Sequence, residues 1–325
     1  MHNKQVLFSF DEIISIEEIS EQTYVNWIFK VILKIKNKQK VVYLRQSREF
    51  VKKKPDIKLD PKRIVLEVKI IKFLQTIIPN VTPHVLYFDK TNNIVILEDI
   101  KKNGHLLVHE LTQGKVYPET GKYFGKIIAT IHGKTLQIPH RKVHGTKTKN
   151  ELAKNFHLGM RLSPAKNIYP EDTKKLLIES NIAIKCLVLG DLASKNIFVD
   201  GNKIRFLDLE RVFIGDPAFD LAFLFCHYLI EVPRKSLPHA LEFIKNFMQS
   251  YRKEINKYLL VADINRLESR TIKFLGITIL YRLYGFYLAV NVKNENNYWE
   301  NIADKLLLSN NKETNLTIKL RNTFI

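Results

Sequence analysis

Residues 189–210 read LGDLASKNIFVDGNKIRFLDLE, and this stretch decides which fold the chain can adopt. It contains two β-rich runs, 196–199 and 203–209, separated by Asp200-Gly201-Asn202. An Asp-Gly pair between two such runs is typical of a tight antiparallel hairpin. The stretch therefore predicts a hairpin around which the rest of the chain can be placed.

Three carboxylates and one carboxamide come close together if this hairpin forms. The turn returns Asn196 to the side of Asp208, and because side chains alternate along a strand, Asp208 and Glu210 are expected to share one face. Asp191 lies in the loop just before the first strand. Carboxylate and amide oxygens are the ligands that Mg²⁺ takes, usually one or two from protein and the rest from phosphate and water. The pattern indicates a site for a hard cation.

Length and composition indicate a globular protein with a large core and two lobes. The chain has 325 residues, of which 45% are hydrophobic and 10% aromatic. Its 52 Lys+Arg against 33 Asp+Glu give a net charge of +19, and such a charge would normally suggest nucleic acid or an anionic membrane as a partner. The lysines are scattered, however, and neither a basic stripe nor a nucleic-acid-binding motif occurs. General compositional bias is therefore the preferred explanation, and we do not expect nucleic acid as a partner.

Cysteine usage and hydropathy favour a cytoplasmic location. Cys186 and Cys226 each lie in an apolar run, as buried core residues do in a reducing compartment. Residues 1–11 lack the basic start and apolar stretch of a signal peptide. The most apolar run, 274–290, contains Arg282, which favours a buried helix over a membrane span. We expect no membrane association.

The first hundred residues predict a small antiparallel β lobe with one helix. Two strand pairs are expected, 27–35 with 40–45 and 84–88 with 93–97. Between them Asp60-Pro61 predicts a helix start, with the helix running to about Gln75. Later segments, from 117 onwards, have mostly helical periodicity. We therefore predict an α+β fold divided into residues 1–99 and 100–325.

Glu67 is an acidic residue close to the apolar face of the predicted helix. An unpaired carboxylate there is costly, so Glu67 is expected to pair with a cation. Arg45, at the end of the preceding strand, is the best placed candidate by connectivity. The alternative is that Glu67 lies at the margin of the face and reaches water.

Several motifs occur in a recognisable order. The strongest are Gly190-Asp191 through Lys195-Asn196, then Asp208-Leu209-Glu210, then 215–220 with the sequence GDPAFD. Weaker matches are Asn26, Leu44-Arg45-Gln46, Glu67, Leu97-Glu98-Asp99, and Arg282 with Gly285. In this order they resemble a bilobal protein-kinase-like fold. More closely, the chain resembles the aminoglycoside phosphotransferase and choline kinase family of small-molecule kinases, nearest the bacterial 5-methylthioribose kinase branch.

The resemblance implies ATP- and Mg²⁺-dependent transfer of a phosphoryl group, directly and in line, to a hydroxyl group of a small metabolite. Sugars and amino alcohols are the implied acceptor classes. Asp191 would orient the acceptor hydroxyl and take its proton. Asn196 and Asp208 would hold Mg²⁺ against the phosphates. Glu210 would assist at the metal or on the acceptor.

The resemblance also implies nucleotide contacts in residues 1–99, the implied nucleotide-binding lobe. Arg45 stands where the family has a phosphate-gripping lysine, and Glu67 would hold it. Adenine would bond to backbone groups from Ile96 to Glu98, and Lys195 would touch the transferred phosphate. Before residue 104 there is no glycine for a phosphate loop, so Ser20, Gln22 or Thr23 would contribute side chains from the loop 20–26.

Two departures from the family pattern leave alternatives open. Leu189 stands where the family usually has histidine, and Arg45 replaces the lysine with a planar fork. A nucleotide-binding pseudokinase would explain both changes as relics of lost catalysis. A basic nucleic-acid-binding protein is the second alternative. The sequence does not indicate the oligomeric state.

Overall fold

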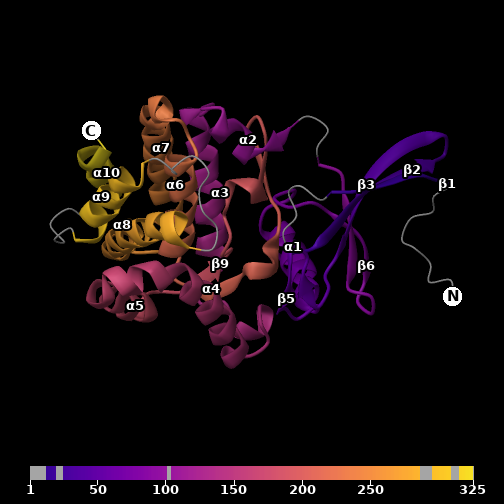
Figure 1. The fold of residues 1–325 in the computed structure, drawn as a ribbon, viewed down its shortest axis with the longest axis horizontal. Helices are drawn as coiled ribbons and strands as arrows, with labels where there is room; N and C mark the ends of the chain where they lie inside the picture. Colours follow the sequence, from indigo (N-terminus) through magenta and orange to yellow (C-terminus); the bar gives the residue numbers. More distant parts are fainter. Residues whose placement is uncertain (1–11, 20–24, 101–103, 286–294, 309–314, 325) are drawn as a thin grey trace. The chain divides into compact units, whose positions relative to one another are not determined.

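The computed structural model describes residues 12–19, 25–100, 104–285, 295–308 and 315–324 (Figure 1). They form two compact units, which we call the sheet unit (residues 1–104 and 205–210) and the helical unit (105–204 and 211–325). The sequence-based division had placed 205–210 in the second lobe, whereas this segment groups with the sheet unit. The combination of antiparallel sheets and helices confirms the predicted α+β class.

The sheet unit is built on a five-stranded antiparallel sheet with the order β1-β2-β3-β7-β6. Its elements are β1 (Glu12–Glu18), β2 (Trp27–Ile35), β3 (Lys38–Gln46), β4 (Phe50–Val51), β5 (Lys54–Lys58), α1 (Arg63–Ile77), β6 (Val85–Asp89) and β7 (Ile94–Glu98). Helix α1 packs on the sheet through Ile64 and Val68, which surround Val95 of β7. Both predicted strand pairs are present.

Helix α1 begins later than the sequence suggested. Asp60-Pro61 was expected to supply the N-cap and the first helical residue, but the helix starts at Arg63. Asp60 instead accepts a hydrogen bond from the backbone N–H of Lys62 at 2.8 Å, which forms a turn before the helix. An Asp side chain that bonds to backbone two residues on makes such a turn readily.

The helical unit surrounds one fully buried helix. Its elements are β8 (His105–Leu106), α2 (Leu107–Thr112), α3 (Gly121–Lys134), α4 (Lys147–Ile168), α5 (Pro170–Ile182), β9 (Cys186–Val188), β10 (Ile197–Asp200), β12 (Phe213–Gly215), α6 (Ala218–Ile230), α7 (Leu237–Ile255), α8 (Val261–Tyr284), α9 (Asn296–Leu307) and α10 (Leu316–Phe324). All residues of α6 are buried, and α7 and α8 pack beside it (Figure 1). A helix that is apolar on every side forms the centre of a core.

The predicted hairpin forms, but its second strand is shorter than expected. β11 (Lys203–Phe206) is next to β10, with Gly201 in the turn at φ +55°. The strand had been predicted to reach Leu209, which is wrong. Asp208 has a left-handed backbone, φ +57°, and Leu209–Arg211 form a 3-10 helix. Strand alternation therefore does not place Asp208 and Glu210, because the strand ends at Phe206 and Asp208 itself leaves the extended region.

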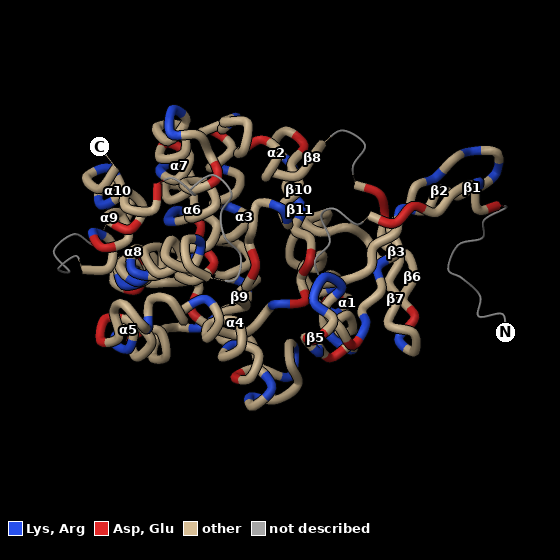
Figure 2. Tube along the Cα trace, in the orientation of Figure 1, with Lys and Arg blue, Asp and Glu red and all other residues tan. Residues whose placement is uncertain are grey.

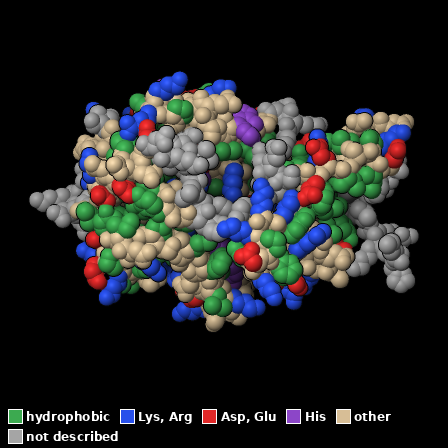
Figure 3. Space-filling view, viewed as in Figure 1, with side chains coloured by type: hydrophobic (Ala, Val, Ile, Leu, Met, Phe, Trp, Pro, Cys, Tyr) green, Lys and Arg blue, Asp and Glu red, His purple; other side chains and the backbone are tan. Residues whose placement is uncertain are grey.

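Charged residues are spread over the elements of both units. Lys and Arg positions occur on most helices and strands in Figure 2, and on the face drawn in Figure 3 basic side chains alternate with acidic and apolar ones. The described helices include none with the length and apolar character needed to cross a bilayer. Cys186 and Cys226 are buried and unbridged.

Gly125 provides a test of the packing of α3 against α7. A Cβ at this position would lie 2.2 Å from the carbonyl oxygen of Phe247, so the two backbones touch there. We expect Gly125→Ala to lower the free energy of unfolding by about 1–3 kcal/mol, because the helices must separate. The measurement is urea denaturation.

Gly159, in the middle of α4, is the matched control because nothing lies within 4 Å of its added Cβ. Gly159→Ala should leave stability unchanged or raise it by up to about 1 kcal/mol through helix propensity. Equal effects of the two substitutions would contradict the close approach of α3 and α7.

Candidate functional site

In the sheet unit, the buried guanidinium of Arg45 holds three carboxylates together. Its Nη1 donates to Oε1 of Glu67 at 2.7 Å, so the partner predicted for Glu67 is correct. Its Nη2 donates to Oδ1 of Asp208 at 2.5 Å and lies 3.4 Å from Oε2 of Glu210. One strand residue thus connects helix α1 with the segment 205–210.

Glu210 receives two further donors. Its Oε2 accepts from Nδ2 of Asn26 at 2.9 Å and from Nε of Arg63 at 3.2 Å. Arg63 also donates through Nη2 to Oδ1 of Asn26 at 2.7 Å, which closes a ring of three side chains. Asn26 is one of the weaker family matches in the sequence, whereas no sequence motif includes Arg63. The sequence signal that could have identified Arg63 is its position as a cation at the start of α1, where acidic residues are more usual.

Burial and charge oppose each other in this network. Burial lowers the pKa of Arg45, but Asp208, Glu67 and Glu210 together raise it more, so the guanidinium stays charged. Burial raises the pKa of Glu67 above its usual range, with Asp208 and Glu210 acting in the same direction and Arg45 opposing them. Arg45 is therefore what allows these carboxylates to lie so close together.

In the helical unit, the loop that carries Asp191 is fixed through its backbone. Asp220 of α6 accepts the N–H of Leu189 at 2.7 Å through Oδ2 and the N–H of Gly190 at 2.9 Å through Oδ1. Gly190 has φ +78°, and a Cβ there would lie 2.2 Å from the carbonyl oxygen of Arg211. The turn before Asp191 therefore requires glycine. Leu189 itself is buried.

The carboxylate of Asp191 is held on both oxygens. Oδ1 accepts from Nη2 of Arg161 at 2.8 Å, and Oδ2 accepts from Nδ2 of Asn196 at 3.1 Å. Nε of Arg211 lies 3.7 Å from Oδ2. Burial alone would raise the pKa of Asp191, but Arg211, Arg161 and Lys195 outweigh it and lower the pKa to about 2. Asp191 is thus an oriented, ionised carboxylate at neutral pH.

A second acidic group ties the same loop to the end of α6. The hydroxyl of Ser194 donates to Glu231, which also accepts from Nδ1 of His227 at 2.7 Å. Arg282 of α8 donates to Glu231 through Nη2 at 3.3 Å. Arg282, noted in the sequence as a weak family match, therefore belongs to a buried cluster beneath the loop. Glu231 is the member of this cluster that the sequence analysis missed.

His157 of α4 lies close to the arginines around Asp191. It is buried, and its ring stacks on Phe213 with centroids 6.4 Å apart. Burial lowers the pKa of His157 to about 3, and the positive charges of Arg211 and Arg161 act in the same direction. The imidazole is therefore neutral at pH 7.

The residues expected to contact the nucleotide have different environments. Ile96 lies in β7 opposite Leu44 of β3 and Tyr87 of β6. A strand with a neighbour on each side directs its backbone N–H and C=O groups to those neighbours. Backbone contacts to a ligand are therefore expected just after Glu98, where β7 ends, rather than at Ile96.

Glu98 and Lys195 are less enclosed. Glu98 accepts from Arg205 Nη1 at 3.1 Å and from the His84 N–H at 3.0 Å, while its own N–H donates to His84 at 3.0 Å. Lys195 is exposed on the 3-10 helix Ser194–Asn196. Ser20, Gln22 and Thr23 lie outside the described residues.

The expected metal ligands belong to different units, Asp208 to the sheet unit and Asn196 to the helical unit. The described residues contain no group of three or more His, Cys, Asp or Glu side chains that could hold a metal ion. Mg²⁺ bound to nucleotide needs only one or two protein oxygens. The carboxylate of Asp208 and the amide oxygen of Asn196 are of the right chemical type for that role.

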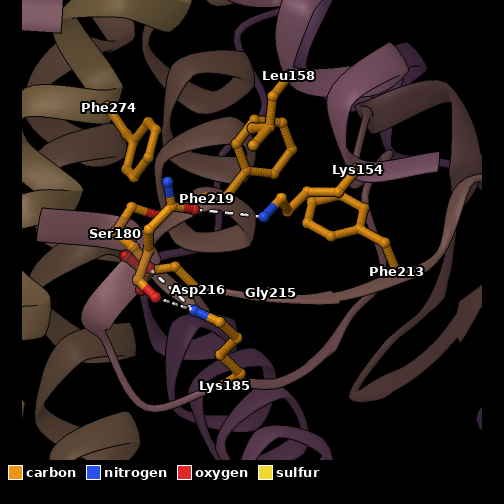
Figure 4. A pocket seen from close by; sticks show the side chains of 10 residues that line it. Lys154, Leu158, Ser180, Lys185, Phe213, Gly215, Asp216, Phe219 and Phe274 are labelled. Carbon is orange, nitrogen blue, oxygen red and sulfur yellow. Dashed lines mark hydrogen bonds between the residues drawn. The ribbon is translucent and has the colours of Figure 1, made fainter. Parts of the chain in front are cut away.

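A small pocket elsewhere in the helical unit is lined by two lysines and aromatic rings (Figure 4). Lys154 donates to Oδ1 of Asn181 at 3.3 Å, and Lys185 lies 3.4 Å from the carbonyl oxygen of Ser180. The acceptor of Lys154 is a side-chain amide oxygen, whereas Lys185 contacts backbone oxygens of Ser180 and Asn181 in the last turn of α5, which carry partial negative charge. Lys185 therefore caps the helix end, and the rings of Phe213, Phe219 and Phe274 form the apolar wall.

Comparison with known proteins agrees with the resemblance seen in the sequence. Residues 160–251 match the phosphotransferase enzyme family, and this segment contains Asp191, Asn196, Asp208 and Glu210. The predicted resemblance is confirmed.

Methylthioribose kinase from Geobacillus kaustophilus is 24% identical over 206 residues, 54% of this chain and 50% of the relative. Methylthioribose kinase from Bacillus velezensis is 23% identical over 254 residues, 64% of this chain and 63% of the relative. The chain thus spans about half to two thirds of these relatives.

Solved structures agree on the fold over nearly the whole chain. An ethanolamine kinase from Plasmodium vivax has a TM-score of 0.56 at 15% identity, covering 96% of this chain and 81% of its own. An aminoglycoside phosphotransferase from Alicyclobacillus acidocaldarius has a TM-score of 0.54 at 11% identity, and the match covers 100% of this chain and 96% of that protein's chain. At this identity the likeness shows the fold alone, and it confirms the protein-kinase-like architecture.

Arg45 should be the main electrostatic support of the sheet unit. Arg45→Met leaves Glu67 buried beside two other carboxylates, so we expect a loss of about 3–5 kcal/mol in unfolding free energy at pH 7.5. Arg205→Met removes a partly exposed ion pair with Glu98 and should cost about 1 kcal/mol or less. Urea denaturation of both variants measures this, and equal costs would contradict the account of the Arg45 network.

His157 should make stability depend on pH. Its pKa is about 3 in the folded state and near 6.5 when unfolded, so between these values the unfolded chain binds more protons and stability falls as pH falls. His157→Phe keeps the ring but removes the titration. Between pH 4 and 6 its unfolding free energy should fall less steeply than that of the wild type, by about 1.4 kcal/mol per pH unit. Identical slopes in chemical denaturation would show that His157 is not held neutral.

Proposed function

We propose that this protein is a small-molecule kinase that uses ATP and Mg²⁺ to phosphorylate a hydroxyl group of a small metabolite of the sugar or amino-alcohol class. The observation that carries the proposal is the fixing of Asp191 by Arg161 and Asn196, within the segment that matches the phosphotransferase family. Phosphoryl transfer needs mainly positioning and charge stabilisation. An ionised carboxylate held on both oxygens meets the first requirement.

In the helical unit, Asp191 would orient the acceptor hydroxyl and accept its proton. A carboxylate whose pKa is lowered to about 2 is a weak base, so the proton should move late, as the new O–P bond forms. The amide nitrogen of Asn196 is used by Asp191, which leaves its oxygen as the metal ligand. Lys195, whose charge acts on Asp191, would contact the transferred phosphoryl group.

In the sheet unit, Arg45 would turn Nη2 from Asp208 to the nucleotide phosphates while Glu67 holds Nη1. A planar guanidinium binds phosphate oxygens as a fork, where a lysine would act as a point charge. Asp208 would be the carboxylate ligand of Mg²⁺, and Glu210 would support it or reach the acceptor. Mg²⁺, when bound, would neutralise charge on the phosphate oxygens. Adenine would bond to backbone groups at the end of β7, near Glu98.

Charge bears on the choice of acceptor. A protein with a net charge of +19 repels strongly cationic acceptors at long range. In the helical unit, Glu231 already accepts from Ser194, His227 and Arg282, so it is not available to attract an amine. Neutral or anionic sugars are therefore preferred to polycationic acceptors.

The pseudokinase alternative rests on Leu189 and Arg45. The side chain at 189 is not needed to shape the turn, because Asp220 holds the backbone N–H groups of Leu189 and Gly190. Arg45 keeps the positive charge of the lysine it replaces and retains the Glu67 partner. These contacts favour the enzyme over the pseudokinase, and the experiment below separates the two.

The test combines ligand binding with turnover. We expect Mg·ATP to raise the melting temperature, and a panel of sugars and amino alcohols to include an acceptor that gives ADP release. Asp191→Asn should lower kcat by at least about 100-fold, because the amide can orient the hydroxyl but cannot take its proton. Asn is preferred to Ala because it leaves Arg161 a hydrogen-bond acceptor.

Asp200→Asn, in the hairpin turn, is the control and should retain activity. Stabilisation by nucleotide without turnover for any acceptor would favour the pseudokinase. No stabilisation by any nucleotide would contradict the kinase proposal. Nucleic-acid binding that falls steeply with salt and is unaffected by Asp208→Ala would favour the nucleic-acid-binding alternative.

A further inference from the structure

Arg161 of α4 is a buried cation that the sequence motifs do not account for. Its relative exposure is 3%, and its guanidinium lies over the rings of Phe223 and Phe219, at 4.1 and 5.1 Å from their centroids. Nη1 donates to the carbonyl oxygen of Gly190, and Nη2 donates to Oδ1 of Asp191 at 2.8 Å. In the described part of the chain, Asp191 is the one carboxylate within ion-pair distance of Arg161.

This arrangement is costly if its only purpose is stability. Burial of a guanidinium carries a large desolvation penalty, which lowers the pKa of Arg161 even with Asp191 beside it. Apolar side chains of similar volume often serve as well or better in a purely structural role. An apolar side chain in place of Arg161 would pack well against the aromatic rings on one side of it. The cost therefore points to a task at Asp191.

The contacts of Arg161 complete the support of the Asp191 loop. Asp220 takes the N–H groups of Leu189 and Gly190, while Arg161 takes the carbonyl of Gly190 and the carboxylate of Asp191. The loop is thus held from α6 and from α4, and the side chain of Leu189 contributes no hydrogen bond. A guanidinium that bonds to backbone and carboxylate together fixes the rotation of the carboxylate about its side-chain bonds.

We propose that Arg161 is a positioning residue, which orients the carboxylate of Asp191 for phosphoryl transfer and makes a histidine at position 189 unnecessary. The proposal rests on the kinase function proposed above. It makes Leu189 compatible with full activity. Because Asn196 and Arg211 act on the other oxygen of Asp191, loss of Arg161 leaves the carboxylate attached at one side only.

The experiment compares Arg161→Met with Arg270→Met. Arg270 of α8 is the matched control because it is also buried, with 9% exposure, and pairs with one carboxylate, Asp216, at 2.6 Å through Nε and 3.2 Å through Nη2. Each substitution removes one buried arginine–aspartate pair, but only the first involves Asp191. Both proteins are assayed with Mg·ATP and the panel acceptor that gives the wild type its highest turnover, well below their melting temperatures.

For Arg161→Met we expect kcat to fall by about 100-fold, as misplacement of a reacting group by about 1 Å does, with KM for ATP within about threefold of the wild type. Arg270→Met should lower the melting temperature while kcat stays within about threefold. Arg161→Lys, which keeps a charge but not the fork, should recover about a tenth of the wild-type kcat. If Arg161→Met does not fold, Arg161→Lys and Arg161→Gln carry the comparison.

The double variant Arg161→Met/Asp191→Asn separates positioning from a general effect. If Arg161 acts through Asp191, the double variant should be no slower than Asp191→Asn alone. Multiplied losses, or a kcat for Arg161→Met equal to that of Arg270→Met, would overturn the positioning role while leaving the kinase function standing. A wild type without turnover on any acceptor would instead overturn the proposed kinase function, and the positioning role with it.

Discussion

Both units depend on the same constraint, which is that a buried guanidinium must be matched by carboxylate and carbonyl oxygens. Arg45 gathers Glu67, Asp208 and Glu210 in the sheet unit, and Arg161 holds Gly190 and Asp191 in the helical unit. Removing one member of such a group leaves an uncompensated charge. The acidic residues that carry the proposed chemistry are therefore oriented by the requirement that keeps the fold intact.

This coupling also fixes the loop that carries Asp191 and Asn196. Asp191 is preceded by a turn that only glycine fits, and the backbone of that turn is bound by Asp220 from the buried helix α6. Ser194, two residues before Asn196, is bound by Glu231 at the end of the same helix. An apolar helix with two acidic residues thus sets the loop at both ends, and a precise loop is what positioning catalysis needs.

Local sequence signals predicted the parts of this arrangement that depend on neighbouring residues. The Asp-Gly turn gave the hairpin, and the pairing of Arg45 with Glu67 followed from an acid on an apolar helix face near a strand end. The end of β11 was misplaced because an Asp at φ +57° resembles any other strand residue in sequence. Arg161 was missed because its contact with Asp191 joins residues 30 positions apart on separate elements. No periodicity marks such a pair, although a lone Arg on the buried side of a helix is a usable signal.

Transfer of phosphate to an acceptor tests the account most directly. ³¹P NMR of the protein with Mg·ATP and the panel of sugars and amino alcohols distinguishes the products. The account predicts a new phosphomonoester signal that grows in step with ADP and is lost in Asp191→Asn. ADP accompanied only by inorganic phosphate, or no change in ATP with any acceptor, would contradict it.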